Sequence, residues 1–385
     1  MKEEHTPVKL SESHVTGTVH PIPLVDLLWQ HRHVSGEVIR RWEAVAETAD
    51  FILGEDVLEF ERAYSAFAGV RHCAGVASGT DALELALRAG GVGAGDEVIV
   101  PTNSFIASAA AVVRAGATPV FVDVDPIYLL IDPTKVAGAV TAKTAAVVAV
   151  HLFGQMAPMT ELRSAVGERM LLIEDAAQAH GASQDGIGPG GFGLAAATSF
   201  YPGKNLGAYG DAGAVLTDDD GIAERTLRLR DHGSSTKYEH PELGFNCRLD
   251  TLQAVVLREK LRFLAAWNGQ RRRAADVYDD LLQDVPDIQT PKVVPGNEHV
   301  WHLYVVRVPN RDRVLGRLRD VGIGAGVHYP IPIHMQGAFR FLGHEKGDFP
   351  VAERSCEEIL SLPIYPGIDV DQQLRVVEEL RRALG

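Results

Sequence analysis

Short apolar runs alternate with helical patterns through the middle of the chain. The runs are rich in β-branched residues and bounded by turn formers, which is typical of buried strands. They are residues 96–101, 118–125, 143–154, 170–177, 196–203 and 213–219. Helical patterns lie between several of them, at residues 80–90, 104–116, 160–167 and 222–233. This alternation requires crossover connections, so it predicts an α/β fold with a mostly parallel sheet flanked by helices.

A second unit follows this region. A long helical pattern at 251–283 leads out of it, and the character of the sequence changes after Pro286. We expect a strand at 300–308, a helix at 311–322, and a strand followed by a loop at 324–330. The last fifteen residues form an amphipathic helical pattern. The sequence therefore predicts a large domain over 1–285 and a smaller C-terminal α/β domain over 286–385.

Composition limits the compartment and the partners. The chain has 385 residues, 46% hydrophobic and 23% charged, which is enough for a globular core without covalent cross-links. Its three cysteines are far apart and odd in number, so we expect a reducing compartment. The start, MKEEHTPVKL, lacks the apolar segment of a signal peptide, and no apolar run is long enough to span a bilayer. A net charge of −14 disfavours nucleic acid. We expect a cytoplasmic protein.

The segment CAGVASGTDALELALRAG places Ser78, Gly79, Thr80 and Asp81 where a strand gives way to a helix. Free backbone amides and the dipole at a helix start favour an anion, and a glycine lets it approach the backbone. The simpler interpretation is an ordinary N-cap, which such residues supply to most helices. Taken alone, the segment favours the N-cap.

A second segment, LLIEDAAQAHG, ends an apolar strand in Glu174 and Asp175. A carboxylate at the edge of a buried sheet is costly unless a cation or a donor accompanies it. Asp175 could hold a protonated ring nitrogen, with Gln178 donating a hydrogen bond nearby, or it could cap the following segment. The sequence leaves these two interpretations equal, and it favours a structural role for His180.

The third segment, SFYPGKNLGAYGDAG at residues 199–213, contains a single lysine, Lys204, among glycines and aromatic residues. A desolvated lysine has a lowered pKa and becomes a nucleophile that can form a Schiff base. The alternative is a lysine exposed on a surface loop. An anion site, an acid for a ring nitrogen and a lysine for an aldehyde are together what pyridoxal phosphate requires. The three segments therefore indicate that cofactor.

These motifs identify a resemblance that covers nearly the whole chain. The sequence resembles the nucleotide-sugar aminotransferases, a family of fold-type I pyridoxal-phosphate enzymes. Besides the three segments, the resemblance rests on IPLVDLLWQ at the start, GFNCRLDTLQAVVLREKL in the middle and GVHYPIPIHMQGAF near the end. It implies the fold-type I transferase architecture. A related branch of dehydratases carries histidine where this chain has Lys204, which disfavours sugar deoxygenation.

The resemblance implies a role for each cofactor residue. Lys204 would carry the cofactor as a Schiff base and move the proton, and Asp175 would pair with the pyridine nitrogen. Gln178 would contact the phenolic oxygen of the cofactor. The other implied contacts are Gly79, Thr80 and Ser199 with the phosphate and Phe105 stacked on the ring. Without the resemblance, Phe105 reads as a core residue of its helix.

The resemblance also implies residues for the partner subunit and for the substrate. Asn246 would reach the phosphate of the neighbouring subunit's cofactor, which requires a homodimer; alone it reads as a turn asparagine. The residues implied near the sugar are Tyr201, His328, Tyr329 and His334. The expected reaction moves an amino group from an amino acid, taken to be L-glutamate, to a keto group of a nucleotide-linked deoxysugar.

Two segments, NCRLDTLQA at 246–254 and HYPIPIH at 328–334, resemble family members that act on 3-keto sugars. They favour a dTDP-3-keto-6-deoxyhexose as substrate, a precursor of amino sugars in antibiotics or surface glycans. The alternatives are a 4-keto nucleotide sugar, a cyclitol ketone, or a regulator that binds the cofactor without turnover. An NAD-linked oxidoreductase is disfavoured, because GPGGFG at 188–193 follows no buried strand. The histidine pairs 31/33 and 299/302 lack companions at metal spacing, so we expect no metal and packing or surface roles for them.

Overall fold

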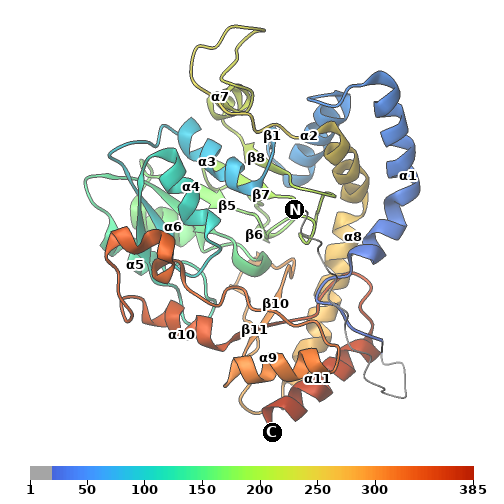
Figure 1. Cartoon of the computed structure of the whole chain (residues 1–385). Helices are drawn as coiled ribbons and strands as arrows, with labels where there is room; N and C mark the ends of the chain where they lie inside the picture. Colours follow the sequence, from blue (N-terminus) through green and yellow to red (C-terminus); the bar gives the residue numbers. More distant parts are fainter. Residues whose placement is uncertain (1–19) are drawn as a thin grey trace, which may run out of the picture.

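A computed structural model describes residues 20–385 of the chain. The N-terminal stretch that argued against a signal peptide lies outside these residues. A seven-stranded sheet forms the centre of the molecule (Figure 1). Its strands, in spatial order, are β1 (His72–Val76), β8 (Gly213–Thr217), β7 (Ala195–Ser199), β5 (Leu171–Asp175), β4 (Thr144–Val150), β2 (Glu97–Pro101) and β3 (Thr118–Val122). Only the pairs that involve β8 are antiparallel, so the expected mostly parallel sheet is confirmed.

Helices cover both faces of this sheet, because its side chains alternate between two apolar clusters. Val98 and Val100 of β2 belong to one cluster, and Ile99 belongs to the other. The first cluster includes residues of α3, α4 and α7, and the second includes residues of α2, α6 and α8. The bounds are α2 (Glu55–Ala68), α3 (Gly79–Ala89), α4 (Ala107–Ala115), α5 (Pro133–Ala139), α6 (Met159–Val166), α7 (Asp220–Arg230) and α8 (Thr251–Leu282).

Helix α8 is the longest element and links the sheet to the C-terminal elements (Figure 1). Helix α1 (Leu27–Thr48) packs along the outer side of α8. The sequence analysis predicted neither α1 nor α2. None of the helices within residues 20–385 is both long and apolar enough to cross a bilayer.

The C-terminal elements build a third apolar cluster around a two-stranded antiparallel sheet of β10 (Tyr304–Arg307) and β11 (Ile359–Leu362). This cluster also contains Ile22 and the end of α8, from Ala274 to Leu282. The other elements are β6 (Ser183–Gln184), β9 (Asn297–Glu298), α9 (Arg311–Asp320), α10 (Pro350–Glu358) and α11 (Val370–Leu384), with three short 3₁₀ helices at Leu152–Gly154, Ile333–Met335 and Gly337–Leu342.

Two expected strands differ from the structure. The strand expected at 300–308 starts only at Tyr304, because Trp301 has a φ of 47°, which extended backbone does not allow. The expected strand within 324–330 is absent; Gly326 makes a single bridge to Ser361 instead. At residues 300–303 the apolar pattern reflects burial, and not an extended strand.

Candidate active site

A cavity of about 540 Å³ opens beyond the carboxyl ends of β5 and β7, where α/β sheets bind their ligands. It collects residues from distant parts of the chain. Its lining includes ten of the residues expected in the site: Gly79, Thr80, Phe105, Asp175, Gln178, Ser199, Tyr201, Lys204, His328 and Tyr329. The sheet topology explains this gathering, because strand ends that are distant in sequence meet at one edge.

Lys204 lies in the loop that follows β7. Its backbone amide donates to the carbonyl of Tyr201 at 2.9 Å, so the loop turns tightly just before the lysine. Part of the side chain faces the cavity, but protein surrounds the amine closely. This burial lowers the pKa of Lys204 to about 8, while the negative charge of Asp175 acts in the opposite direction. At pH 7 roughly a tenth of the amine is therefore uncharged and nucleophilic, against less than about a thousandth for an unperturbed lysine.

We expect the reactivity of Lys204 in the apoprotein to fall as the pH drops below about 8, because protonation removes the nucleophilic lone pair. An unperturbed lysine would lose its reactivity below about pH 10.4. The measurement is the rate of acylation of Lys204 by a small reagent, followed by peptide mass spectrometry across this range. A midpoint near pH 10 would show that the cavity does not lower the pKa of Lys204.

Asp175 ends β5 and points its carboxylate into the site, where two donors hold it. The Ser108 hydroxyl donates to Oδ2 at 2.6 Å, and the Ala177 amide donates to Oδ1 at 3.2 Å. Ser104 contacts the Ser108 hydroxyl at 2.7 Å, which extends the chain of hydrogen bonds. Asp175 is 9% exposed, so it has a fixed direction and little contact with water.

Replacing Ser108 by alanine is expected to lower kcat about tenfold, because a hydrogen bond to a charged group contributes about 1.5–3 kcal/mol. Ser108 lies on α4 and not among the cavity-lining residues, so substrate KM should change little. Steady-state kinetics of S108A check this, with S164A on exposed α6 surface as the control. An unchanged kcat would show that the hydrogen bond from Ser108 to Asp175 does not contribute to catalysis.

Glu174 points to the opposite side of β5 and has a structural role. Its carboxylate accepts hydrogen bonds from the backbone amides of Gly190 at 3.1 Å and Gly193 at 2.7 Å, and from the His151 ring at 2.8 Å. His151 Nδ1 accepts from the Ala157 amide, so its proton is on Nε2, facing the carboxylate. The glycine-rich segment 188–193 thus surrounds an internal carboxylate, not a nucleotide.

The start of α3 serves both as an ordinary N-cap and as a suitable anion site, the two interpretations of its sequence. Ser78 is indeed the N-cap, accepting from the Asp81 amide at 3.1 Å. The amides of Gly79 and Thr80, however, donate to no other described residue. A Cβ on Gly79 would lie 2.5 Å from the Cβ of Ser199, so only glycine allows this approach. Two free amides and a hydroxyl at a helix start suit a phosphate.

Gln178 and the aromatic residues shape the cavity wall. The Gln178 side chain accepts from the Phe153 amide at 2.6 Å and donates to the Tyr329 hydroxyl at 3.2 Å. The Phe105 ring is 50% exposed and lies 5.3 Å from the Tyr329 ring, so it faces the opening and is not a core residue. His328 contacts Ser361 at 2.8 Å, and burial, with Lys204 nearby, lowers the pKa of His328 to about 4.

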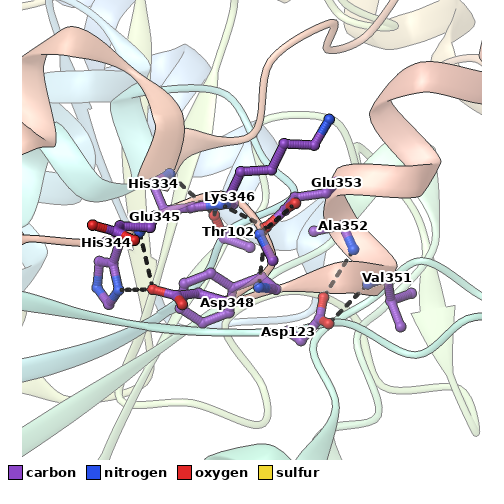
Figure 2. Close-up of polar contacts among 12 residues, drawn as sticks. Thr102, Asp123, His334, His344, Glu345, Lys346, Asp348, Val351, Ala352 and Glu353 are labelled. Atoms are coloured by element: carbon purple, nitrogen blue, oxygen red, sulfur yellow. Dashed lines mark hydrogen bonds and ion pairs between the residues drawn. The ribbon is translucent and has the colours of Figure 1, made fainter.

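His334 is not brought to the cavity. Figure 2 shows it between Thr102, beyond β2, and Glu353, on α10. Its Nδ1 lies 2.8 Å from the Thr102 hydroxyl and its Nε2 lies 3.1 Å from Glu353, and only 2% of the residue is exposed. Both ring nitrogens are engaged, so His334 has none free for a sugar. It joins the segment after Tyr329 to the sheet edge.

Asn246 also lies outside the cavity, in a separate depression that shares only Asp211 with it. Its side chain is exposed, and its Oδ1 accepts from Arg248 at 2.7 Å. Arg248 is in turn paired with Asp231 at 2.7 Å. Within one subunit, Asn246 therefore does not reach the residues around Lys204.

One lining residue that the sequence analysis assigned to packing is His302. Its Nδ1 lies 3.2 Å from Asn205 Oδ1, next to Lys204 in sequence. Burial, then the Lys204 charge, lowers the pKa of His302 well below its usual value, so it is neutral. His180 is buried too, as its predicted structural role requires, with Nε2 2.9 Å from the Ser199 carbonyl. No spacing in the sequence distinguishes His302 from its neighbour His299.

The comparison with known proteins decides the family. The model of the DegT/DnrJ/EryC1/StrS aminotransferase family matches residues 33–381. The chain belongs to this family. The crystal structure of DesV from S. venezuelae, in complex with a ketimine intermediate, superimposes with a TM-score of 0.92 at 42% identity, covering 94% of this chain and 98% of that one.

Two relatives from other organisms illustrate the range of names in the family. The dTDP-3-amino-3,4,6-trideoxy-alpha-D-glucose transaminase of Micromonospora megalomicea subsp. nigra is 44% identical over 363 residues, 93% of this chain and 97% of that protein. A protein of Geobacillus stearothermophilus named pleiotropic regulatory protein is 45% identical over 363 residues, covering 93% and 97%. Relatives of about the same sequence identity are therefore named as a transaminase in one case and as a regulatory protein in the other.

Membership makes the chain a pyridoxal-phosphate-dependent sugar aminotransferase with the fold-type I architecture. The residues of the cavity fit the cofactor: a lysine of lowered pKa, a held carboxylate and a helix start with two free amides. Within residues 20–385, no three candidate metal ligands gather into a group.

Proposed function

We propose that this aminotransferase moves an amino group from L-glutamate to the 3-keto group of a dTDP-linked 6-deoxyhexose, in the cytoplasm. The observation that carries the proposal is one cavity that holds Lys204 and Asp175 beside the free amides of α3. The 3-amino sugar in the Micromonospora relative's name supports the position of amination. Glutamate is the donor we infer from the resemblance.

Each residue has a task in this proposal. Bound pyridoxal phosphate supplies an aldehyde for amines and a ring that stores the electrons of a broken C–H bond. Asp175 would keep the ring nitrogen protonated, and Gly79, Thr80 and Ser199 would hold the phosphate. Lys204 would hold the cofactor at rest, and its free amine would accept and return the proton of the donor carbon. Its lowered pKa suits this alternation, because the amine both gives and accepts a proton near pH 8.

The sugar enters from the open side of the cavity. Tyr201 is 59% exposed in the loop that carries Lys204, and His328 and Tyr329 also line the cavity. We propose that these three residues contact the sugar. The neutral His328 ring can accept or donate a hydrogen bond without adding charge near Lys204, which favours an uncharged hydroxyl or keto group as its partner.

We further propose a homodimer in which Asn246 completes the phosphate site of the partner subunit. A mixture of K204A and N246A proteins, each with little activity, should then regain activity as subunits exchange. One intact site forms in each heterodimer, so about a quarter of the wild-type activity is expected from random pairing. If mixing restores nothing although heterodimers form, Asn246 acts within its own subunit or not at all.

A substrate panel tests the proposed function. Purified protein with glutamate is offered dTDP-linked 3-keto and 4-keto 6-deoxyhexoses and a cyclitol ketone, and mass spectrometry identifies the amines. We expect the amine from the 3-keto sugar to form at least tenfold faster than from the others. Products only from the 4-keto sugar or the cyclitol would overturn the 3-keto assignment and leave the transfer chemistry intact.

A regulator without turnover is the second candidate, since the Geobacillus relative carries a regulatory name. Lys204 and Asp175 together favour the enzyme, because a binding module has no need for an amine of lowered pKa. The visible absorbance of the bound cofactor separates the two. It should disappear within seconds of adding glutamate to the enzyme, and it would persist in a regulator.

A further inference from the structure

Helix α8 carries a row of polar side chains against the loop that follows Lys204: Gln253 is half-buried, and Lys260 and Asn268 are buried. Their spacing of seven and eight residues places them near one face of the helix, which has 3.6 residues per turn. The pairs are Gln253 Oε1 with the Tyr209 amide at 2.9 Å, Lys260 Nζ with the Gly207 carbonyl at 2.7 Å, and Asn268 Oδ1 with the Asn205 side chain at 3.0 Å. Every second residue of the loop is thus held by the same helix, in antiparallel order.

Lys260 is the unusual member of this row. Only 2% of it is exposed, and its Nζ forms no ion pair with a carboxylate within the described residues. Its contacts are the Gly207 carbonyl and the face of the Tyr209 ring, whose centroid lies 4.7 Å away. Burial lowers the pKa of Lys260 to about 8. A buried amine without a carboxylate is costly compared with an apolar side chain, so its location calls for a compensating role.

The carbonyl that Lys260 holds belongs to the residue that closes the loop. A Cβ on Gly207 would lie 2.3 Å from the Pro202 carbonyl oxygen, so the chain folds back on itself here and only glycine fits. Lys204 lies within this closed turn, between Pro202 and Gly207. Any rotation of the Gly207 peptide therefore alters the path of the backbone that carries Lys204.

We propose that Lys260 is a positioning residue for amino transfer: it fixes the closed turn 202–207 and thereby the direction in which Lys204 enters the cavity. Lys260 does not line the cavity, so it acts through the backbone and not by contact with the cofactor or substrate. The inference rests on the proposed role of Lys204 for its effect on turnover. The effect on the loop itself does not depend on that role.

The test compares K260M with a matched control on the same helix, L282A. Leu282 is buried near the end of α8 and packs in the third apolar cluster, which contains no residue of the loop 202–210. Methionine preserves most of the volume of lysine but cannot donate to the Gly207 carbonyl, which would then be buried and unpaired. Hydrogen exchange of the apoprotein reports on residues 205–210 without any cofactor.

We expect K260M to speed exchange in residues 205–210 about tenfold and to lower kcat about tenfold, with KM within about threefold. L282A should lower the unfolding temperature without a selective effect on the loop. The side-chain amide of K260Q can still donate a hydrogen bond, on a shorter side chain. K260Q should therefore show slower exchange in residues 205–210 and a higher kcat than K260M. It also serves as the test if K260M does not fold.

Three results would overturn the proposal. In one, exchange in residues 205–210 is the same in K260M as in the wild type. In another, K260M and L282A speed exchange equally along the whole chain, which would make Lys260 an ordinary core residue. In the third, K260M loosens the loop but leaves kcat unchanged, so the loop does not position Lys204 for turnover. If K204A loses turnover and K260M keeps it, only the positioning role of Lys260 is wrong. If K204A keeps turnover, the proposed function itself is wrong.

Discussion

Replacing Lys204 by alanine is expected to reduce kcat by at least about 10⁴-fold, because the variant loses both a nucleophile and a general acid–base group. The cavity and the phosphate contacts would remain, so K204A should still bind the cofactor, but without a covalent link. Single-turnover kinetics with glutamate and a 3-keto sugar measure the loss. Cofactor content after gel filtration measures the retained binding.

K143A provides the control for this prediction, because Lys143 is an exposed lysine in the turn before β4. Its kinetics should match those of the wild type. A K204A protein that completed turnovers within about tenfold of the wild-type rate would show that another group moves the proton. Lys260 could not take over the role of Lys204, because the Lys260 side chain is buried beneath the loop.

Replacing Asp175 by asparagine is expected to lower kcat by about 30- to 5 × 10³-fold. The carboxylate lies buried at the end of β5 with two fixed donors, and loss of a buried charged partner costs about 2–5 kcal/mol. Asparagine preserves the shape but cannot hold a proton on the ring nitrogen. The ring then stores electrons poorly, so removal of the donor's proton should become the slow step.

A deuterium label on the α-carbon of glutamate checks this explanation. The isotope effect on kcat should be larger in D175N than in the wild type, while the unfolding temperature stays similar. If D175N had wild-type kcat and the same isotope effect, Asp175 would be only a structural residue of the strand end.

The sheet and the edge that holds the site were predictable because chain order dictates them. Each buried strand that ends in a polar residue, such as β5 before Asp175, places that residue at the carboxyl edge when the strands run parallel. Lys204 follows the neighbouring strand β7, so the lysine and the carboxylate were expected to share one edge. The structure places both in one cavity.

Side-chain direction was not predictable in the same way. His334 is only five residues from Tyr329, yet Thr102 and Glu353 bind its ring and keep it away from the cavity. These partners lie 232 and 19 residues away in sequence, and no local pattern reveals them. Ser108 was missed for the same reason, since its hydroxyl meets Asp175 across 67 positions.

Phe105 shows how a helix boundary changes the meaning of a residue. A helix from 104 onward would make it a core residue of that helix. The helix starts only at Ala107, so Phe105 precedes it and faces the cavity opening. Apolar periodicity locates helices well but their ends poorly, because capping and tertiary contacts fix the ends.

Reductive trapping of the cofactor tests the central claim most directly. Borohydride treatment of the protein with bound pyridoxal phosphate, followed by digestion and mass spectrometry, shows which lysine carries the cofactor. We predict a phosphopyridoxyl group on Lys204, and its loss when glutamate is added before borohydride. A label on another lysine, or a label at Lys204 that glutamate leaves unchanged, would contradict the account of this site as the centre of amino transfer.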